Sequence, residues 1–129
     1  MTVEADLVRV AERFLAAWNS QDVEAVVACY SAGVTYRDPN TRGEVIGADA
    51  MRRYLRKLFA AWQMHWTLKE VHAFADGTGA AVLWHASFRM TGQEQSVEAE
   101  GMDLVIMDGD RIKRNEVYFD RAALAPLMR

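Results

Sequence analysis

The chain of 129 residues is 51% hydrophobic and 26% charged, which predicts one globular domain over residues 1–129. Its formal net charge of -3, from 15 basic and 18 acidic residues, argues against a nucleic-acid partner, because phosphate backbones attract strongly basic surfaces. No apolar run approaches the roughly 18 residues of a membrane span, and no basic-then-apolar leader opens the chain. Cys29 is the single cysteine, so an internal disulfide is excluded, and we expect a cytoplasmic protein with no membrane partner.

The first half of the chain predicts helices, because apolar residues recur there every three or four positions. This spacing covers residues 3–18 and returns over residues 23–30, so two amphipathic helices are expected, the second ending at Gly33. Residues 34–38 then predict a strand that is followed by a loop. A third amphipathic helix is predicted over residues 47–62.

Beyond the third helix the apolar pattern changes from a helical period to alternation, which is typical of strands. Four strands are predicted at residues 64–75, 80–90, 97–107 and 111–119. Tight turns connect them, so they are expected to form an antiparallel meander with the three helices covering one face. The sequence therefore predicts an α+β fold.

The predicted strand over residues 97–107 has two faces of different character. Met102, Leu104 and Ile106 are apolar on one face, and Asp103 lies on the other among apolar neighbours. Because the helices can cover only one of these faces, we expect the other to contact a second copy of the chain. The sequence thus predicts a homodimer through the open face of the sheet.

Asp38 is the first candidate for catalysis. It precedes Pro39, which disfavours helical backbone in the residue before it, so Asp38 is expected to be extended at the end of a strand. A carboxylate held in an apolar pocket can serve as a general base, because burial raises its pKa toward the working pH. Asp-Pro is also a common turn opener, and the sequence leaves both interpretations open.

Asp103 is the second candidate, because strand alternation places it on the same face as Ala99, Val105 and Met107. An ionised carboxylate is costly in such surroundings, so Asp103 is expected to be protonated or to have a hydrogen-bonding partner. A protonated Asp103 would donate a hydrogen bond to a developing oxyanion. Alternatively, it accepts hydrogen bonds from a neighbouring strand or pairs with an arginine.

A pocket for a small hydrophobic ligand is expected between the helices and the sheet, because large aromatic side chains converge there. These candidates for substrate binding are Phe14, Trp18, Tyr30, Tyr54, Phe59, Trp84 and Phe88. His65 joins them if its strand turns it toward the pocket, although a slip of one residue would turn it outward. Histidines at metal-ligand spacing and glycine-rich phosphate loops are both absent from the sequence, so neither a metal nor a cofactor is expected.

Several segments together resemble one family. They are residues 14–19, 22–25, 36–39 (Tyr36-Arg37-Asp38-Pro39), 47 with 51–54, 100–103 and 108–112. The chain resembles the nuclear-transport-factor-2-like superfamily and, within it, the SnoaL-like polyketide cyclases and ketosteroid isomerases. The resemblance implies a curved antiparallel sheet wrapped around three N-terminal helices to form a conical pocket, an architecture also described as a cystatin-like α+β barrel.

The resemblance also implies roles for site residues. Asp38 matches the family's base and Asp103 its protonated Asp, whereas Phe14 stands where ketosteroid isomerases place an oxyanion-hole tyrosine. Tyr30 or Tyr54 could supply that hydroxyl instead. The implied activity is a cofactor-independent proton transfer next to a carbonyl, of the isomerase, cyclase or lyase type, on a small polyketide- or steroid-like molecule.

Other interpretations of the sequence stay open. Asn115 is a further candidate for substrate binding and Glu116 lies next to it, although the facing of neither is decided by the pattern. The same pocket could belong to a non-catalytic small-molecule-binding module or be filled in a dimeric interaction protein. An epoxide hydrolase is a further alternative, but the Arg-x-Asp arrangement of limonene-epoxide hydrolases is absent, because Gly101 precedes Asp103 by two positions.

Overall fold

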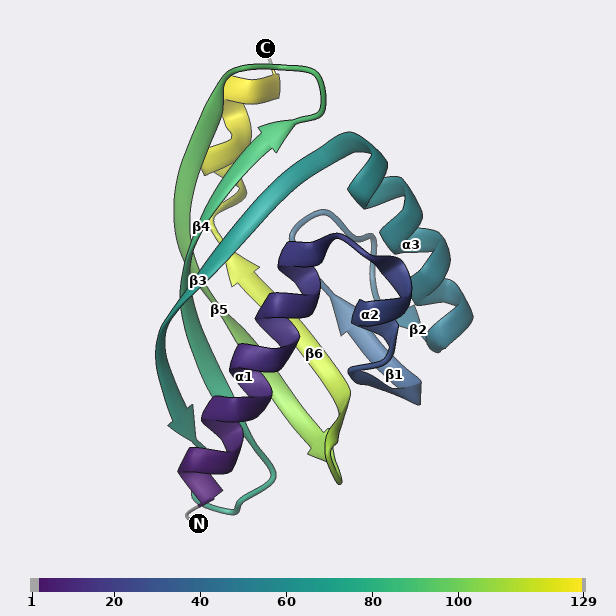
Figure 1. The fold of residues 1–129 in the computed structure, drawn as a ribbon, viewed down its shortest axis with the longest axis vertical. Helices are drawn as coiled ribbons and strands as arrows, with labels where there is room; N and C mark the ends of the chain where they lie inside the picture. The colour runs from purple at the N-terminus through teal and green to yellow at the C-terminus, as the bar shows by residue number, and fades with distance from the viewer. Residues whose placement is uncertain (1–2, 129) are drawn as a thin grey trace.

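The computed structural model describes residues 3–128, with side chains from residue 5 onward. Its helices and strands, in chain order, are α1 (Val3–Ser20), α2 (Val23–Val27), β1 (Tyr30–Arg37), β2 (Val45–Ile46), α3 (Ala48–Ala61), β3 (Trp62–Ala73), β4 (Gly79–Met90), β5 (Ser96–Asp108), β6 (Arg111–Phe119) and the 3-10 helix η1 (Arg121–Met128). Figure 1 shows a curved sheet with α1 lying across its inner face and α2 and α3 beside it. None of these helices is both long and apolar enough to cross a membrane.

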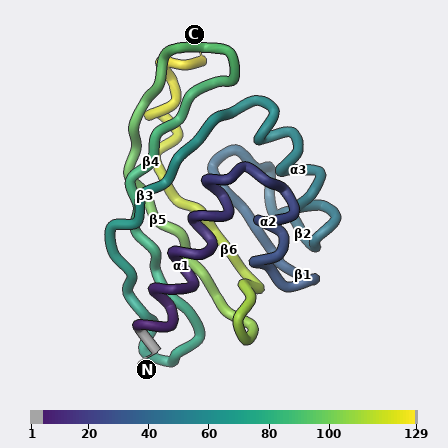
Figure 2. Tube along the Cα trace, in the orientation of Figure 1, coloured from purple at the N-terminus to yellow at the C-terminus, as the bar shows by residue number. Residues whose placement is uncertain are grey.

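The strands form one six-stranded sheet in the order β2-β1-β6-β5-β4-β3. All neighbouring pairs are antiparallel except β1 and β6, which run parallel. The sheet curves but does not close, so β2 and β3 remain its two edges, and the chain termini lie at opposite ends of the long axis (Figure 2). The predicted α+β class and the predicted meander of β3 to β6 are confirmed.

The second helix is shorter than its apolar spacing predicts. Helix α2 ends at Val27, and the chain is already extended at Tyr30 rather than helical as far as Gly33. Tyr30 pairs with Ile112 of β6, and the backbone N–H of Ile112 donates to the carbonyl of Cys29. The prediction of a helix ending at Gly33 was wrong, because pairing with a distant parallel strand overrides a local helical pattern.

The third helix begins at Ala48, one residue after the predicted start at Gly47. Gly47 stands before α3 with φ of 87°, a conformation that L side chains rarely adopt. Its N–H donates to the carbonyl of Val34, which holds the start of α3 against β1. Trp62, predicted as the last helical residue, instead opens β3 in an extended conformation.

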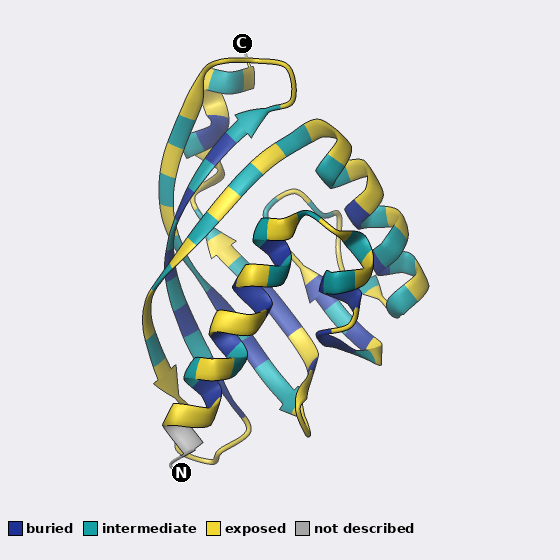
Figure 3. Cartoon of the chain, viewed as in Figure 1, coloured by how far each residue is buried: buried dark blue, intermediate teal, exposed yellow. Residues whose placement is uncertain are grey.

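The core lies between the helices and the inner face of the sheet. Along β4 buried residues alternate with half-buried ones, and the buried side chains are those of Ala80, Val82, Trp84, Ala86 and Phe88. Dark blue residues in Figure 3 gather where α1 and the sheet face each other. Met102, Leu104 and Ile106 lie on the other face of the sheet and are half-buried.

Candidate functional site

A cavity lies between α1, α3 and the inner face of the sheet, and both predicted acids line it. Its volume is about 40 Å³, and Asp38 and Asp103 are among its lining residues, together with Phe14, Trp18 and Phe88. Most of the remaining lining is aromatic or aliphatic, and no Lys, Arg or His among the described residues contributes to it. The cavity is therefore an apolar space with two carboxyl groups in its wall.

Asp38 is fully engaged as a hydrogen-bond acceptor. Its Oδ1 accepts from the backbone N–H groups of Asn40 at 2.7 Å and Thr41 at 3.1 Å. Its Oδ2 accepts from the hydroxyl of Tyr36 at 2.6 Å and from that of Tyr54. Asp38 thus opens a turn with its Oδ1, as one of the two interpretations predicted, and it also lines the cavity.

The two tyrosines bonded to Asp38 stay protonated at any ordinary pH. Burial raises the pKa of Tyr36 well above its usual range, and the Asp38 carboxylate raises it further. The pKa of Tyr54 is raised by the same two causes. Tyr36 is 2% exposed and lines the cavity, whereas Tyr54 lies behind Asp38 and does not line it.

Asp103 is a buried acid held by two donors. It is 4% exposed, and strand alternation on β5 turns it inward as predicted. Its Oδ1 accepts from Trp84 Nε1 at 2.8 Å and its Oδ2 from Asn115 Nδ2 at 3.1 Å. Burial raises the pKa of Asp103 to about 6; the two donors counteract this increase, and the Asp38 carboxylate adds to it.

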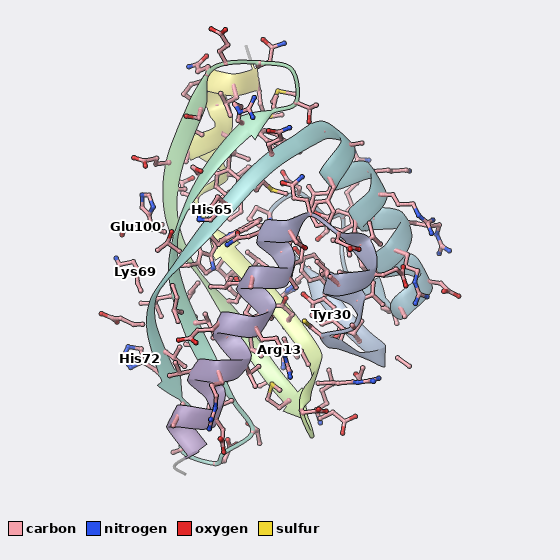
Figure 4. All side chains as sticks on the ribbon, viewed as in Figure 1. Arg13, Tyr30, His65, Lys69, His72 and Glu100 are labelled. Atoms are coloured by element: carbon pink, nitrogen blue, oxygen red, sulfur yellow. The ribbon has the colours of Figure 1, made fainter. Side chains whose placement is uncertain are left out.

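Asn115 connects Asp103 to the aromatic cluster of α1 and β1. Its Oδ1 accepts from the hydroxyl of Tyr30 at 2.6 Å, and the oxygen of that hydroxyl accepts from Trp18 Nε1 at 3.2 Å. Tyr30, labelled in Figure 4, lies at the start of β1 next to β6. Neither Tyr30 nor Asn115 lines the cavity, so these two predicted substrate-binding residues support the site from behind.

Three other predicted binding residues also lie outside the cavity wall. Trp84 donates to Asp103 and Tyr54 to Asp38, so both contact the acids instead of the empty space. Phe59 of α3 packs edge-on against Trp18, with ring centroids 5.8 Å apart. Of the predicted site residues, those that line the cavity are the two acids and the aromatic residues Phe14, Trp18 and Phe88.

The structure places His65 away from the cavity. His65 pairs with Ser87 on the outer face of β3, whereas the flanking Met64 and Trp66 pair with the buried Phe88 and Ala86. Figure 4 labels His65 on this edge strand, and its side chain is exposed. The prediction that His65 lines the pocket is corrected, because adjacent strand residues point to opposite faces.

Several cavity residues were not predicted. They include Tyr36, Trp62, Met64, Trp66, Val117, Phe119 and Leu124. The even positions from Trp62 to Trp66 follow strand alternation, and assigning the faces of β3 from its pairing with β4 would have identified them. Leu124 gives no such signal, because it comes from η1 after the last strand.

Glu116 faces the opposite side of the sheet from Asn115. It accepts hydrogen bonds from Arg37 at 2.6 Å and from Arg114 and Tyr118, all on the outer face. These donors hold the pKa of Glu116 at about 2, well below its usual range. Lys69, His72 and Glu100 also project from the side of the sheet away from the helices (Figure 4). On β6, Asn115 therefore faces the buried side of the sheet, and Glu116 faces the outer side, away from the cavity.

Within residues 3–128, no group of three His, Cys, Asp or Glu side chains is arranged to hold a metal ion. The carboxyl groups that line the cavity are bonded to neutral protein donors instead. These carboxyl groups can take part in proton transfer and hydrogen bonding.

Comparisons with known proteins agree on the fold. The chain is similar to SalBIII, an epoxide hydrolase/cyclase-like enzyme of pyran ring formation in the polyether salinomycin, with 20% identity, a TM-score of 0.81 and coverage of 93% of this chain and 95% of that one. It is similar to a proposed isomerase from Bacillus subtilis with 13% identity, a TM-score of 0.86 and coverage of 99% and 96%. A computationally designed 17-OHP binder matches with 13% identity, a TM-score of 0.77 and coverage of 92% and 95%.

Among functionally curated proteins, no relative matches the chain. The model of the SnoaL-like domain matches residues 11–115, which include both cavity acids and run from α1 into β6. The chain belongs to the family of SnoaL-like domains.

Proposed function

We propose that the protein is a cofactor-independent acid/base enzyme that moves a proton next to a carbonyl in a small hydrophobic molecule. The observation that carries this proposal is that Asp38 and Asp103, from the end of β1 and from β5, line one apolar cavity. In the proposed reaction Asp38 takes the proton, and a protonated Asp103 donates a hydrogen bond to the oxygen that becomes negative. Phe14, Trp18 and Phe88 contact the substrate from the cavity wall.

Asp38 must release a hydrogen bond before it can act as a base. A carboxylate has about four lone-pair sites, and two backbone amides and two tyrosine hydroxyls already occupy them. Tyr36 is the donor that lines the cavity, so a substrate oxygen can accept the hydrogen bond of the Tyr36 hydroxyl in place of Asp38 and free one lone pair of the carboxylate. In this mechanism Tyr36 supplies the hydroxyl that Phe14 lacks, and Tyr54 continues to orient the base.

The size of the cavity limits what can enter it. A volume of about 40 Å³ holds roughly three water molecules, so a ring-sized ligand must displace wall side chains. A shallow hollow of about 390 Å³ adjoins the cavity and shares Asp38, Val117 and Phe119 with it. We propose that the reacting end of the substrate enters the cavity and that the rest extends past Asp38 into this hollow.

The proposal is tested by an assay that needs no known product. Hydrophobic carbonyl compounds are first screened for raising the melting temperature of the protein and of Asp38→Asn. Each compound that binds is then incubated in D₂O, and exchange of its α-protons is followed by NMR. Catalysed exchange by the natural protein and its loss in a still-binding Asp38→Asn supports the enzyme. Equal exchange by both proteins removes Asp38 from the mechanism.

A second candidate is a non-catalytic binding module. Saturation of Asp38 by four donors favours it, because a carboxylate without a free lone pair is a structural element as much as a base. The similarity to a designed 17-OHP binder is compatible with this candidate. Compounds that bind without any deuterium exchange, at every pH between 5 and 8, would favour the binding module over the enzyme.

Epoxide hydrolysis receives less support from the residues of this chain. A Cβ atom at residue 101 would lie 2.6 Å from Cη2 of Trp84 and 2.5 Å from the carbonyl oxygen of Tyr118. The position two residues before Asp103 therefore has no room for an arginine side chain. Turnover of epoxides by the protein is the direct test.

We further propose a homodimer that forms through the outer face of the sheet. Half-buried Leu83, Met102, Leu104 and Ile106 are neighbours there, because Leu83 pairs with Met102 and the other two follow on β5. Light scattering should give twice the chain mass for the natural protein and the single chain mass for Leu104→Glu. A monomeric natural protein would overturn the dimer. The cytoplasmic location is also a proposal, which cell fractionation tests.

A further inference from the structure

The hydrogen bonds that lead to Asp103 have a fixed direction. An indole N–H can only donate, so Trp18 Nε1 donates to the hydroxyl oxygen of Tyr30, and the distance is 3.2 Å. The hydroxyl hydrogen of Tyr30 is then directed to Asn115 Oδ1, which lies 2.6 Å away. Burial raises the pKa of Tyr30 well above its usual range, so this hydrogen is present throughout the working pH range.

This chain of donors also fixes which end of the Asn115 amide faces Asp103. With Oδ1 occupied by Tyr30, the NH₂ group is turned to Asp103 Oδ2 at 3.1 Å and to the carbonyl of Leu104 at 3.3 Å. Asn115 is completely buried, so no solvent molecule can exchange with these partners. Asn115 therefore presents a donor to Asp103 and cannot accept a hydrogen bond from its protonated form.

The second neighbour of the carboxyl group is also a pure donor. Trp84 Nε1 donates to Asp103 Oδ1 at 2.8 Å, and the Trp84 side chain is completely buried. Among the described residues, the hydrogen-bonding partners of the Asp103 side chain are these two donors. A proton carried by Asp103 thus has no protein acceptor beside it, and the open side of the residue is the cavity that it lines.

We propose that Asn115 is a positioning residue: held by Trp18 and Tyr30, it works with Trp84 to direct the proton of Asp103 into the cavity and onto a bound molecule. The inference rests on the acid role given to Asp103 in the proposed function. Both donors stabilise the ionised carboxyl group, so they also decide at which pH the proton is held. The titratable groups that act on Asp103 are Asp38 and Tyr30, and no cationic side chain lines the cavity.

Loss of one donor should therefore raise the pH at which Asp103 ionises. A hydrogen bond to a charged group that is replaced by an apolar contact corresponds to a shift of about one to two pH units. The experiment uses the full chain labelled with ¹³C in the Asp carboxyl carbons, with the Asp103 signal identified by its absence in Asp103→Asn. Asn115→Leu is expected to move the titration midpoint of Asp103 upward by about one to two units from about 6.

Tyr30→Phe is the sharper variant, because it removes one oxygen atom and changes neither Asn115 nor Trp84, the two side chains that donate to Asp103. Without the Tyr30 hydroxyl, the Asn115 amide is free to turn its oxygen to Asp103 and accept a hydrogen bond from the protonated carboxyl group, so the midpoint should rise by at least half a unit. Ile112→Val, a change of similar burial on the same strand, is the control and should leave the midpoint unchanged. A purely structural role for Asn115 and Tyr30 predicts lower stability with no change in the midpoint.

Unchanged midpoints in folded Asn115→Leu and Tyr30→Phe would overturn the inference, and Tyr30→Phe alone decides if Asn115→Leu does not fold. The titration needs neither substrate nor turnover, so its outcome is independent of the exchange assay for Asp38. If the midpoints move but no carbonyl compound exchanges its protons, the positioning of Asp103 stands and the proposed reaction fails. In the enzyme, the pH profile of exchange should shift upward together with the NMR midpoint.

Discussion

Raising the pH from 4 to 7 is expected to destabilise the protein through Asp103. The pKa of this carboxyl group is about 6 in the folded protein and 3.8 at its usual value, so the folded chain holds the proton more tightly than the unfolded chain. Between these two values the folded state binds more protons, and the free energy of unfolding therefore falls as the pH rises. The penalty is complete above pH 6 and absent below pH 3.8.

The magnitude follows from the difference between the two pKa values. A difference of about two units, at 1.36 kcal/mol per unit, corresponds to a loss of about 3 kcal/mol. No discount for solvent screening applies, because Asp103 is 4% exposed. A change of this size is a large fraction of the stability of a typical domain, so ordinary denaturation experiments resolve it.

Urea unfolding followed by tryptophan fluorescence measures the effect at several pH values between 4 and 7. The quantity to compare is the difference between the natural protein and Asp103→Asn, because other titrating groups cancel in it. We expect the natural protein to lose about 2 kcal/mol relative to the variant over this range, because part of the full penalty is already present at pH 4. A difference that stays constant within about 0.5 kcal/mol would refute the reasoning, because Asp103 would then ionise alike in both states.

Three further predictions concern other parts of the site and the sheet. Tyr36→Phe should lower α-proton exchange by about 100-fold while Asp38 keeps its bond from Tyr54, and an unchanged rate would show that Tyr36 does not bind the reacting oxygen. Glu116→Gln should remove roughly 2–3 kcal/mol of stability above pH 4.5 and little near pH 2, because the pKa of Glu116 is lowered; urea unfolding at both pH values checks this. Gly101→Ala should cost about 2–3 kcal/mol, since its Cβ would overlap Trp84, and a melting temperature equal to that of the natural protein would contradict the packing.

Local patterns in the sequence were sufficient for the fold class and for the facing of Asp103. Alternation along β5 depends on neighbouring residues alone, and the structure places Asp103 and Val105 on the buried face as predicted. Asp38 was also identified from its neighbour Pro39, although its partner Tyr54 comes from a helix 16 residues later. Local sequence patterns thus located both acids but did not show which residues form hydrogen bonds with them.

Contacts between distant segments decided the features that sequence reasoning missed. The end of α2 is set by pairing between Tyr30 and Ile112, which are 82 positions apart and have no common local pattern. The bond from Tyr30 to Asn115 spans 85 positions in the same way. A one-residue uncertainty in register was enough to misplace His65, because strand facing reverses at every step.

The two acids of the cavity are held in different ways, and this difference is what allows different roles. Asp38 accepts hydrogen bonds from two backbone amides of its own turn and from two tyrosine hydroxyls. Asp103 has two donors in a dry environment, and burial there outweighs them enough to raise its pKa to about 6. When two neighbouring carboxyl groups lie in different surroundings, one can accept a proton while the other carries one. Because Asp38 also raises the pKa of Asp103, proton uptake by Asp38 would make Asp103 a stronger acid at the moment when a bound oxygen needs its proton.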